Sequence, residues 1–130
     1  MSNRYGFGKE VSYSFNEAIE RVTQALKQEG FGVLTEIDVA ATVKKKLDQE
    51  MLSYRILGAC NPQLAHQALK IDPSIGLLLP CNIVVRMKED GQVYVEFMDP
   101  AAVLDLVNKP EINCISSEAR ERLLRVMHAL

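Results

Sequence analysis

The sequence lacks most of the residue patterns that reveal a reaction. Its 130 residues contain no tryptophan, two histidines and three cysteines. It has no Gly-x-Ser-x-Gly, His-Glu-x-x-His, Walker or Gly-x-Gly-x-x-Gly motif, which excludes the common signatures of hydrolases, zinc proteases and nucleotide-binding proteins. Two histidines, His66 and His128, are too few for a histidine-rich metal site. A function therefore has to be sought in less common arrangements of side chains.

The cysteines are odd in number and have no Cys-x-x-Cys spacing, which excludes a zinc ribbon and a thioredoxin-like motif. Residues 1–6 have no apolar core of signal-peptide length. No stretch approaches the roughly 18 apolar residues that a membrane span needs. We therefore expect a cytoplasmic protein with reduced thiols and no membrane partner.

Composition and charge are those of an ordinary globular protein. Hydrophobic residues make up 48% and charged residues 25% of the chain. A chain of this length can bury one core, so we expect a single domain over residues 1–130. The formal net charge of −2 gives no overall attraction to nucleic acid, and no nucleic-acid partner is expected.

The first part of the chain predicts a strand followed by a helix. Residues 5–13 are rich in β-favouring side chains. Ser14 and Glu17 have the spacing of a capping box, in which each side chain bonds the backbone N–H of the other residue. Gly30 then supplies a left-handed stop for the helix.

A second strand, a short helix and a third strand follow. Residues 31–38 alternate in polarity, which predicts a half-buried strand with the odd-numbered residues on one face. Asp38 is placed to cap a short helix, and the lysines at 44–46 are interpreted as its solvated end, where they complement the helix dipole. Residues 52–59 alternate again and predict the third strand.

The next part of the chain predicts a helix and a hairpin. Residues 62–70 have apolar positions at helical spacing after a proline. Two further strands, 82–88 and 92–98, flank Asp90 and Gly91, and an Asp-Gly pair between such strands is a strong hairpin signal.

Two helices complete the prediction. Residues 101–108 predict a short helix, and Ser116 and Ser117 are candidate caps for a last helix with an apolar stripe. Without the short inserted helices, the order is strand, helix, four strands, helix. We therefore predict an α+β fold, with an antiparallel sheet of about five strands and helices packed on one face. The other face would be partly open or used in association.

The dipeptide Cys-Asn occurs twice, each time at a predicted strand end and next to a proline. If the two strands are antiparallel neighbours, Cys60 and Cys81 face each other at one end of the sheet, with Asn61 and Asn82 beside them. Asn61 is also a candidate N-cap, with Pro62 at the first helical position. Cys60 would then precede a helix N-terminus, which favours a thiolate.

Two interpretations of these thiols stay open. Buried cysteine packs as a small hydrophobe, and apolar surroundings raise a thiol pKa. Alternatively, Cys60 and Cys81 form a functional pair, with His66 within reach on the following helix. Such a pair suits a soft metal such as Cu(I), or Zn(II), and also sulfur or redox chemistry. No other cofactor is predicted.

Three hypotheses for the function follow. The first is a module that binds an unknown small ligand or a partner, with asparagine amides as donors and acceptors. The second is the thiol site for a soft metal or sulfur. The third is an enzyme in which Cys60 is the nucleophile and His66 the base, oriented by Arg55 or Asp99. The candidate ligand-binding residues are Cys60, Asn61, Cys81, Asn82, Arg55 and His66, with Cys60 and Cys81 as metal ligands.

Several segments resemble one known family. They are Tyr-Arg-Ile-Leu-Gly-Ala-Cys-Asn-Pro at 54–62, Gly-Leu-Leu-Leu-Pro-Cys-Asn at 76–82, Glu-Ile-Asp at 36–38 and Asp-Pro at 99–100. In their order along the chain these segments are similar to the bacterial and archaeal domain-of-unknown-function 302 family, over nearly the whole chain. The resemblance implies a fold like that of the TATA-binding protein and small proteins that self-associate through the sheet. It carries no catalytic residues, and we expect a homodimer.

Overall fold

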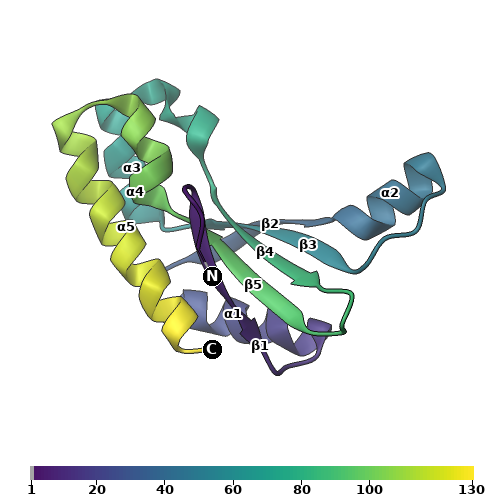
Figure 1. The fold of residues 1–130 in the computed structure, drawn as a ribbon. Coiled ribbons are helices and arrows are strands. Elements are labelled where there is room, and N and C mark those ends of the chain that lie inside the picture. Colours follow the sequence, from purple (N-terminus) through teal and green to yellow (C-terminus); the bar gives the residue numbers. More distant parts are fainter. Residues whose placement is uncertain (1) are drawn as a thin grey trace.

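The computed structural model describes residues 2–130, which form an antiparallel sheet with helices around it (Figure 1). The five strands lie in the order β1-β5-β4-β3-β2. They are β1 (Gly6–Val11), β2 (Gly32–Asp38), β3 (Tyr54–Cys60), β4 (Cys81–Met87) and β5 (Val93–Met98). The helices are α1 (Phe15–Gln28), α2 (Val39–Leu47), α3 (Pro62–Ile71), α4 (Pro100–Leu104) and α5 (Pro110–His128), with short 3-10 helices η1 (Pro73–Leu78) and η2 (Asp105–Val107). The predicted α+β fold is confirmed.

Helix α1 begins and ends where the sequence predicts. The Ser14 hydroxyl accepts a hydrogen bond from the Glu17 N–H at 3.2 Å, and Gly30 has a φ of 81°. In a capping box the Glu17 carboxylate would accept a hydrogen bond from the Ser14 N–H. Here the carboxylate pairs instead with Arg21 at 3.3 Å. The side of α1 that is fully buried consists of Ala18, Val22 and Leu26.

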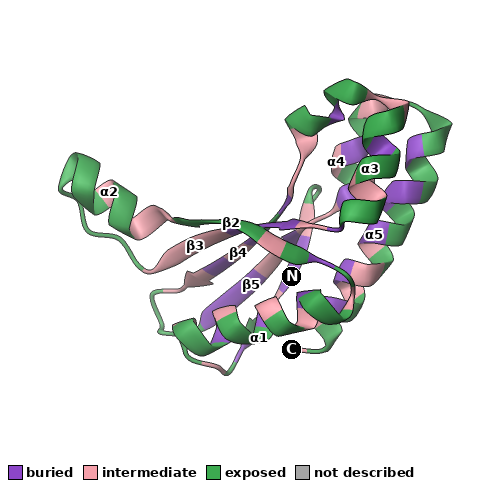
Figure 2. Cartoon of the chain, turned by 180° about the vertical axis from the view of Figure 1, so that it is seen from behind, coloured by how far each residue is buried: buried purple, intermediate pink, exposed green. Residues whose placement is uncertain are grey.

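The main core lies between one face of the sheet and helices α1 and α5 (Figure 2). Full burial of one large aliphatic side chain contributes about 1.5–3 kcal/mol to the stability of the fold. The large side chains that are fully buried in this core are Leu57, Ile83, Val85, Val95, Phe97, Val22, Leu26, Leu123 and Val126. A second cluster, formed by α3, η1, α4 and α5, consists of Ala68, Ile75, Leu104, Ile112 and Ile115.

The opposite face of the sheet is more polar. Asn82 and Arg86 point to it, because they alternate along β4 with the buried residues of the core face. Arg86 pairs with Glu96 at 2.6 Å, and its guanidinium lies 5.0 Å from the ring centre of Tyr94. This ion pair and cation–π contact cover part of the face that the helices leave open.

Helix α5 begins earlier than predicted. It starts at Pro110, whose fixed φ and missing N–H suit the first helical position. The expected cap, Ser116, is a buried residue inside the helix, and its hydroxyl donates to the Asn113 carbonyl at 3.2 Å. The predicted caps at Ser116 and Ser117 are therefore wrong.

A β-bulge changes which side chains of β2 face the core. Val33 and Thr35 pair with consecutive residues of β3, so Leu34 is an extra residue in the strand. Val33 points to the core side, whereas Thr35 and Ile37 point to the open face with their partners Gly58 and Ile56. The expectation that all odd-numbered residues of 31–38 share one face is therefore wrong beyond the bulge.

Helix α2 extends away from the rest of the molecule (Figures 1 and 2). Asp38 caps it as predicted, because its carboxylate accepts from the Ala41 N–H at 2.9 Å. Lys44 pairs with Asp48 at 2.8 Å and with Glu50 at 3.0 Å. The lysines at 44–46 are exposed, which confirms that they form a solvated helix end.

Candidate functional site

The ends of β3 and β4 bring the two cysteines of the Cys-Asn segments together. Ala59 pairs with Cys81 and Gly58 pairs with Asn82, which places Cys60 one residue beyond the partner of Cys81. Cys81 is buried, Cys60 is half-buried, and both line one cavity. The prediction that Cys60 and Cys81 lie at one end of the sheet is confirmed, but the expectation that they face each other is wrong by one residue, because Ala59 and not Cys60 is the partner of Cys81.

This cavity, here called the thiol pocket, has a volume of about 340 Å³. It lies between the two core clusters, and residues of both contribute to its walls. Four of the lining residues have polar or thiol side chains: Thr35, Cys60, Asn61 and Cys81. The apolar walls are Phe31, Leu34, Ala59, Leu64, Ala65, Ala68, Leu69, Leu79, Pro80, Pro100, Leu104, Ile115 and Ala119.

Burial determines the protonation of both thiols. Loss of solvation raises the pKa of Cys60 above its ordinary value. Desolvation, followed by repulsion from a Cys60 thiolate, raises the pKa of Cys81 to about 12. Both thiols are therefore protonated at neutral pH and behave as small, weakly polar groups.

Asn61 has a structural role at the wall of the pocket. Its side-chain oxygen accepts a hydrogen bond from the Leu64 N–H at 3.1 Å, which caps α3 as predicted. The residue is buried, and it lines the pocket beside Cys60. Asn61 thus fixes the direction in which α3 leaves the sheet, and Ala65 and Ala68 of that helix form part of the wall.

Two other predicted site residues lie outside the thiol pocket. Asn82 points to the opposite face of the sheet, where it lines a second hollow together with Tyr54 and Arg86. Adjacent strand residues alternate between faces, so Asn82 cannot share a face with Cys81. His66 is exposed on α3 and does not line the pocket. The pocket therefore gives no support to His66 as a base or ligand for the thiols.

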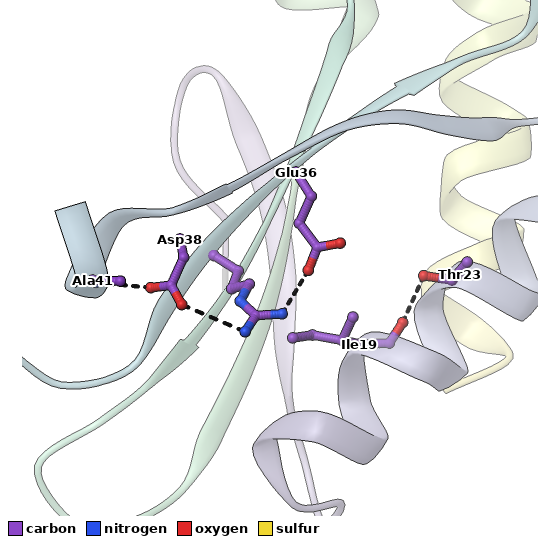
Figure 3. Close-up of polar contacts among 6 residues, drawn as sticks. Ile19, Thr23, Glu36, Asp38 and Ala41 are labelled. Carbon is purple, nitrogen blue, oxygen red and sulfur yellow. Dashed lines mark hydrogen bonds and ion pairs between the residues drawn. The ribbon is translucent and has the colours of Figure 1, made fainter.

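Arg55 lies near the other end of β3, in an ion-pair cluster beside α1 and at the root of α2 (Figure 3). Its guanidinium pairs with Glu36 at 2.6 Å and with Asp38 at 3.4 Å. The same view shows α1, in which the Thr23 hydroxyl donates to the Ile19 carbonyl at 2.7 Å. Arg55 consequently ties β2 to β3, and it is not a residue of the thiol pocket.

Several pocket residues were not anticipated as site residues. Leu104 of α4 and Ile115 and Ala119 of α5 also line the pocket. Their apolar character predicted burial, but their place depends on how α4 and α5 dock on α3. Leu34 enters the site because of the bulge in β2.

The fold and the pocket define a class of protein: a small α+β domain with an apolar cavity at the end of an antiparallel sheet. The chain belongs to the family described as domain of unknown function DUF302, whose sequence model matches residues 7–130. It is similar to the crystal structure of an uncharacterized conserved protein DUF302 from Bacillus stearothermophilus, at 31% identity and a TM-score of 0.90. The similarity covers 96% of this chain and 97% of that chain. No curated protein matches.

Two further properties concern metals and membranes. Within residues 2–130, no three His, Cys, Asp or Glu side chains gather in a cluster that could hold a metal ion. None of the helices described is long and apolar enough to cross a bilayer.

Proposed function

We propose that the thiol pocket binds a small apolar molecule. The observation that carries this proposal is a cavity of about 340 Å³ that lies between two core clusters and is lined almost entirely by apolar side chains. Protein interiors are close-packed and contain few voids larger than a water molecule. Ligand sites typically occupy about 300–1,000 Å³ and are lined mainly by apolar side chains with a few polar groups. The pocket matches that description in size and in lining.

The lining favours an uncharged ligand. None of the residues that line the pocket is Asp, Glu, Lys, Arg or His. The raised pKa values of Cys60 and Cys81 keep both thiols neutral. A charged ligand would lose its hydration without gaining a counter-charge, which is unfavourable. The two thiols are suited to weak polar contacts that orient an apolar molecule.

The test is a fluorescence titration with an uncharged naphthylamine dye that brightens in apolar surroundings. Ala65→Phe fills the pocket from α3, and we expect it to lower the affinity for the dye at least about tenfold. Gln67→Phe adds the same ring to an exposed position on the same helix and should bind the dye like the parent. Thermal unfolding of both variants checks that they are folded. Equal dye affinity in the parent and Ala65→Phe would refute the proposal.

A second candidate function is binding of a soft metal, and the placement of two thiols in one pocket favours it. Thiolates are soft ligands that bind Cu(I) as well as Zn(II), and Cu(I) accepts a site of two thiolates. Structural Zn(II) takes four ligands, which the thiol pocket does not offer. Cys60 and Cys81 therefore suit Cu(I) better than Zn(II), and each thiol would release its proton on binding.

Competition with a chromophoric Cu(I) chelator under anaerobic conditions tests this candidate. Cys60→Ser and Cys81→Ser should each remove Cu(I) binding, whereas Cys114→Ser, at an exposed position, should keep it. If all three variants hold Cu(I) as the parent does, the thiol pocket is not a metal site.

The third hypothesis, a cysteine-dependent enzyme, has the least support. The thiols are neutral at neutral pH, and His66 does not line the pocket. Asp99, one candidate for orienting the base, caps α4 and pairs with Arg120 at 3.1 Å.

We also place the protein in the cytoplasm, where free thiols stay reduced. The three free cysteines support this location.

A further inference from the structure

The two polar side chains in the wall of the thiol pocket lie against the protein itself. The Asn61 oxygen accepts from the Leu64 N–H at 3.1 Å, and the Asn61 nitrogen lies 3.0 Å from the place of a Cβ atom on Gly30. The Thr35 hydroxyl lies against Gly58, where it occupies the place that a Cβ atom would take. Neither glycine lines the pocket. The pocket therefore favours a ligand without strong hydrogen-bonding groups, since such groups would lose their hydration there.

The groups that distinguish one apolar ligand from another are two thiols and one aromatic ring. Among the described residues that line the pocket, Phe31 is the one aromatic side chain, and it is buried. An aromatic ligand gains from offset or edge-to-face contact with such a ring. The polarisable sulfur atoms of Cys60 and Cys81 also make favourable contacts with aromatic rings. A saturated ligand of the same size gains neither kind of contact.

The volume of the cavity limits the size of this ligand. A cavity of roughly 150 Å³ is enough to bind one benzene molecule. The thiol pocket has about 340 Å³, which is room for about two fused six-membered rings. Leu34 and Leu69 line the pocket and are also 68% and 39% exposed. A molecule that enters between β2 and α3 thus passes over apolar side chains.

We propose that the ligand of the thiol pocket is a neutral aromatic compound of about two fused rings, which contacts Phe31 and the thiols of Cys60 and Cys81. This ligand class rests on the proposed function and is narrower, because saturated molecules that fit the cavity lack the contacts with sulfur and with the Phe31 ring. A thiolate would repel the electron-rich face of an aromatic ring. Burial raises the pKa of both thiols and keeps them neutral, which removes that repulsion.

The test compares naphthalene with decalin, its saturated counterpart, by displacement of the naphthylamine dye. The affinity for naphthalene divided by that for decalin, here called the affinity ratio, is measured in the parent and in variants. The different hydration of the two hydrocarbons cancels when these ratios are compared. In Cys60→Ala/Cys81→Ala the affinity ratio should fall at least about threefold. Phe31→Leu should lower it at least about twofold.

The matched control is Leu69→Ala, which shortens an aliphatic side chain of the same pocket. It should weaken the binding of both hydrocarbons alike and leave the affinity ratio unchanged. Thermal unfolding checks that each variant is folded. If the double variant does not fold, Cys60→Ala alone, at a half-buried position, should still lower the ratio about twofold.

The outcomes separate the ligand class from the ligand site. An affinity ratio that is unchanged in both the cysteine variant and Phe31→Leu would overturn the aromatic class. An equal fall in Leu69→Ala would also overturn it, because the ratio would then follow the shape of the cavity. In either case, weaker dye binding by Ala65→Phe would still support a site for apolar molecules. Equal dye affinity in the parent and Ala65→Phe would instead refute the site, and the aromatic class with it.

Discussion

The side-chain nitrogen of Asn61 lies 3.0 Å from the place that a Cβ atom on Gly30 would occupy. Gly30 follows the end of α1 with a φ of 81°, and Asn61 begins α3 through its bond to Leu64. Arg122 of α5 is 3.2 Å from the same place and donates to the Glu29 carbonyl at 3.0 Å. The end of α1, the start of α3 and a side chain of α5 thus meet at Gly30, which has no Cβ atom to occupy the space between them.

Gly30→Ala should destabilise the protein by about 2 kcal/mol. A left-handed backbone costs a residue with a Cβ roughly 1–2 kcal/mol, and contact with the Asn61 amide adds to that cost. Displacement of Asn61 would also weaken the cap of α3. Urea unfolding followed by circular dichroism measures the loss.

Two other glycines separate the backbone cost from the contact. Gly91 has a φ of 85° but open space around its Cβ position, so Gly91→Ala should cost only about 1–2 kcal/mol. Gly32 has open space and no positive φ, and Gly32→Ala should change stability by less than about 0.5 kcal/mol. An equal loss at Gly30 and Gly91 would show that the contact with Asn61 has no energetic weight.

The sequence predicted correctly those helix ends and turns that depend on residues close together in the chain. Ser14 and Gly30 bound α1, and the Asp90-Gly91 pair forms the hairpin turn with bonds between Lys88 and Gln92. The bulge at Leu34 was not predicted, because it depends on pairing between β2 and β3. The start of α5 was misplaced because two serines offered a cap that the packed helix does not use.

The part of the site that was predictable is the part that depends only on the pairing of two strands. Antiparallel pairing of β3 and β4 is enough to bring Cys60 and Cys81 to one end. Strand alternation places Asn82 on the face opposite to Cys81, so the sequence also contains the reason for their separation. The walls from α4 and α5 depend on the docking of helices that follow both cysteines in the chain, which no local pattern specifies.

Alkylation of the thiols by a maleimide at neutral pH should follow their burial. Cys114 is exposed and should react first, half-buried Cys60 next and buried Cys81 last. Burial both blocks the reagent and raises the pKa of Cys60 and Cys81, which lowers the thiolate fraction. Mass spectrometry of peptides after timed quenching gives the order. A Cys60 that reacts faster than Cys114 would contradict it and revive the enzyme hypothesis.

Stability should fall with alkaline pH because of Cys81. Its pKa is about 12 in the folded protein and near 9.0 when exposed, so above pH 9 the unfolded state binds fewer protons than the folded state. Unfolding then becomes easier by up to about 1.4 kcal/mol per pH unit. Urea unfolding between pH 8 and pH 10.5 should show this slope in the parent. Cys81→Ala should lose much of the slope, while Cys114→Ala should keep it; an identical slope in all three would disprove the assignment.

The cap of α2 should depend on an oxygen at Asp38 rather than on its charge. The Asp38 carboxylate accepts from the Ala41 N–H at 2.9 Å, whereas its contact with Arg55 is longer, at 3.4 Å. Asp38→Asn keeps the acceptor and leaves Arg55 paired with Glu36 at 2.6 Å.

Asp38→Ala removes the acceptor, and loss of a cap costs about 1 kcal/mol. Because α2 has no buried residue, this loss should appear in the helix itself and not in the global unfolding midpoint. Hydrogen exchange should therefore accelerate about fivefold at the α2 amides in Asp38→Ala and stay near the parent rate in Asp38→Asn. If amide exchange in α2 accelerates equally in the two variants, the ion pair between Asp38 and Arg55, and not the cap, stabilises the helix.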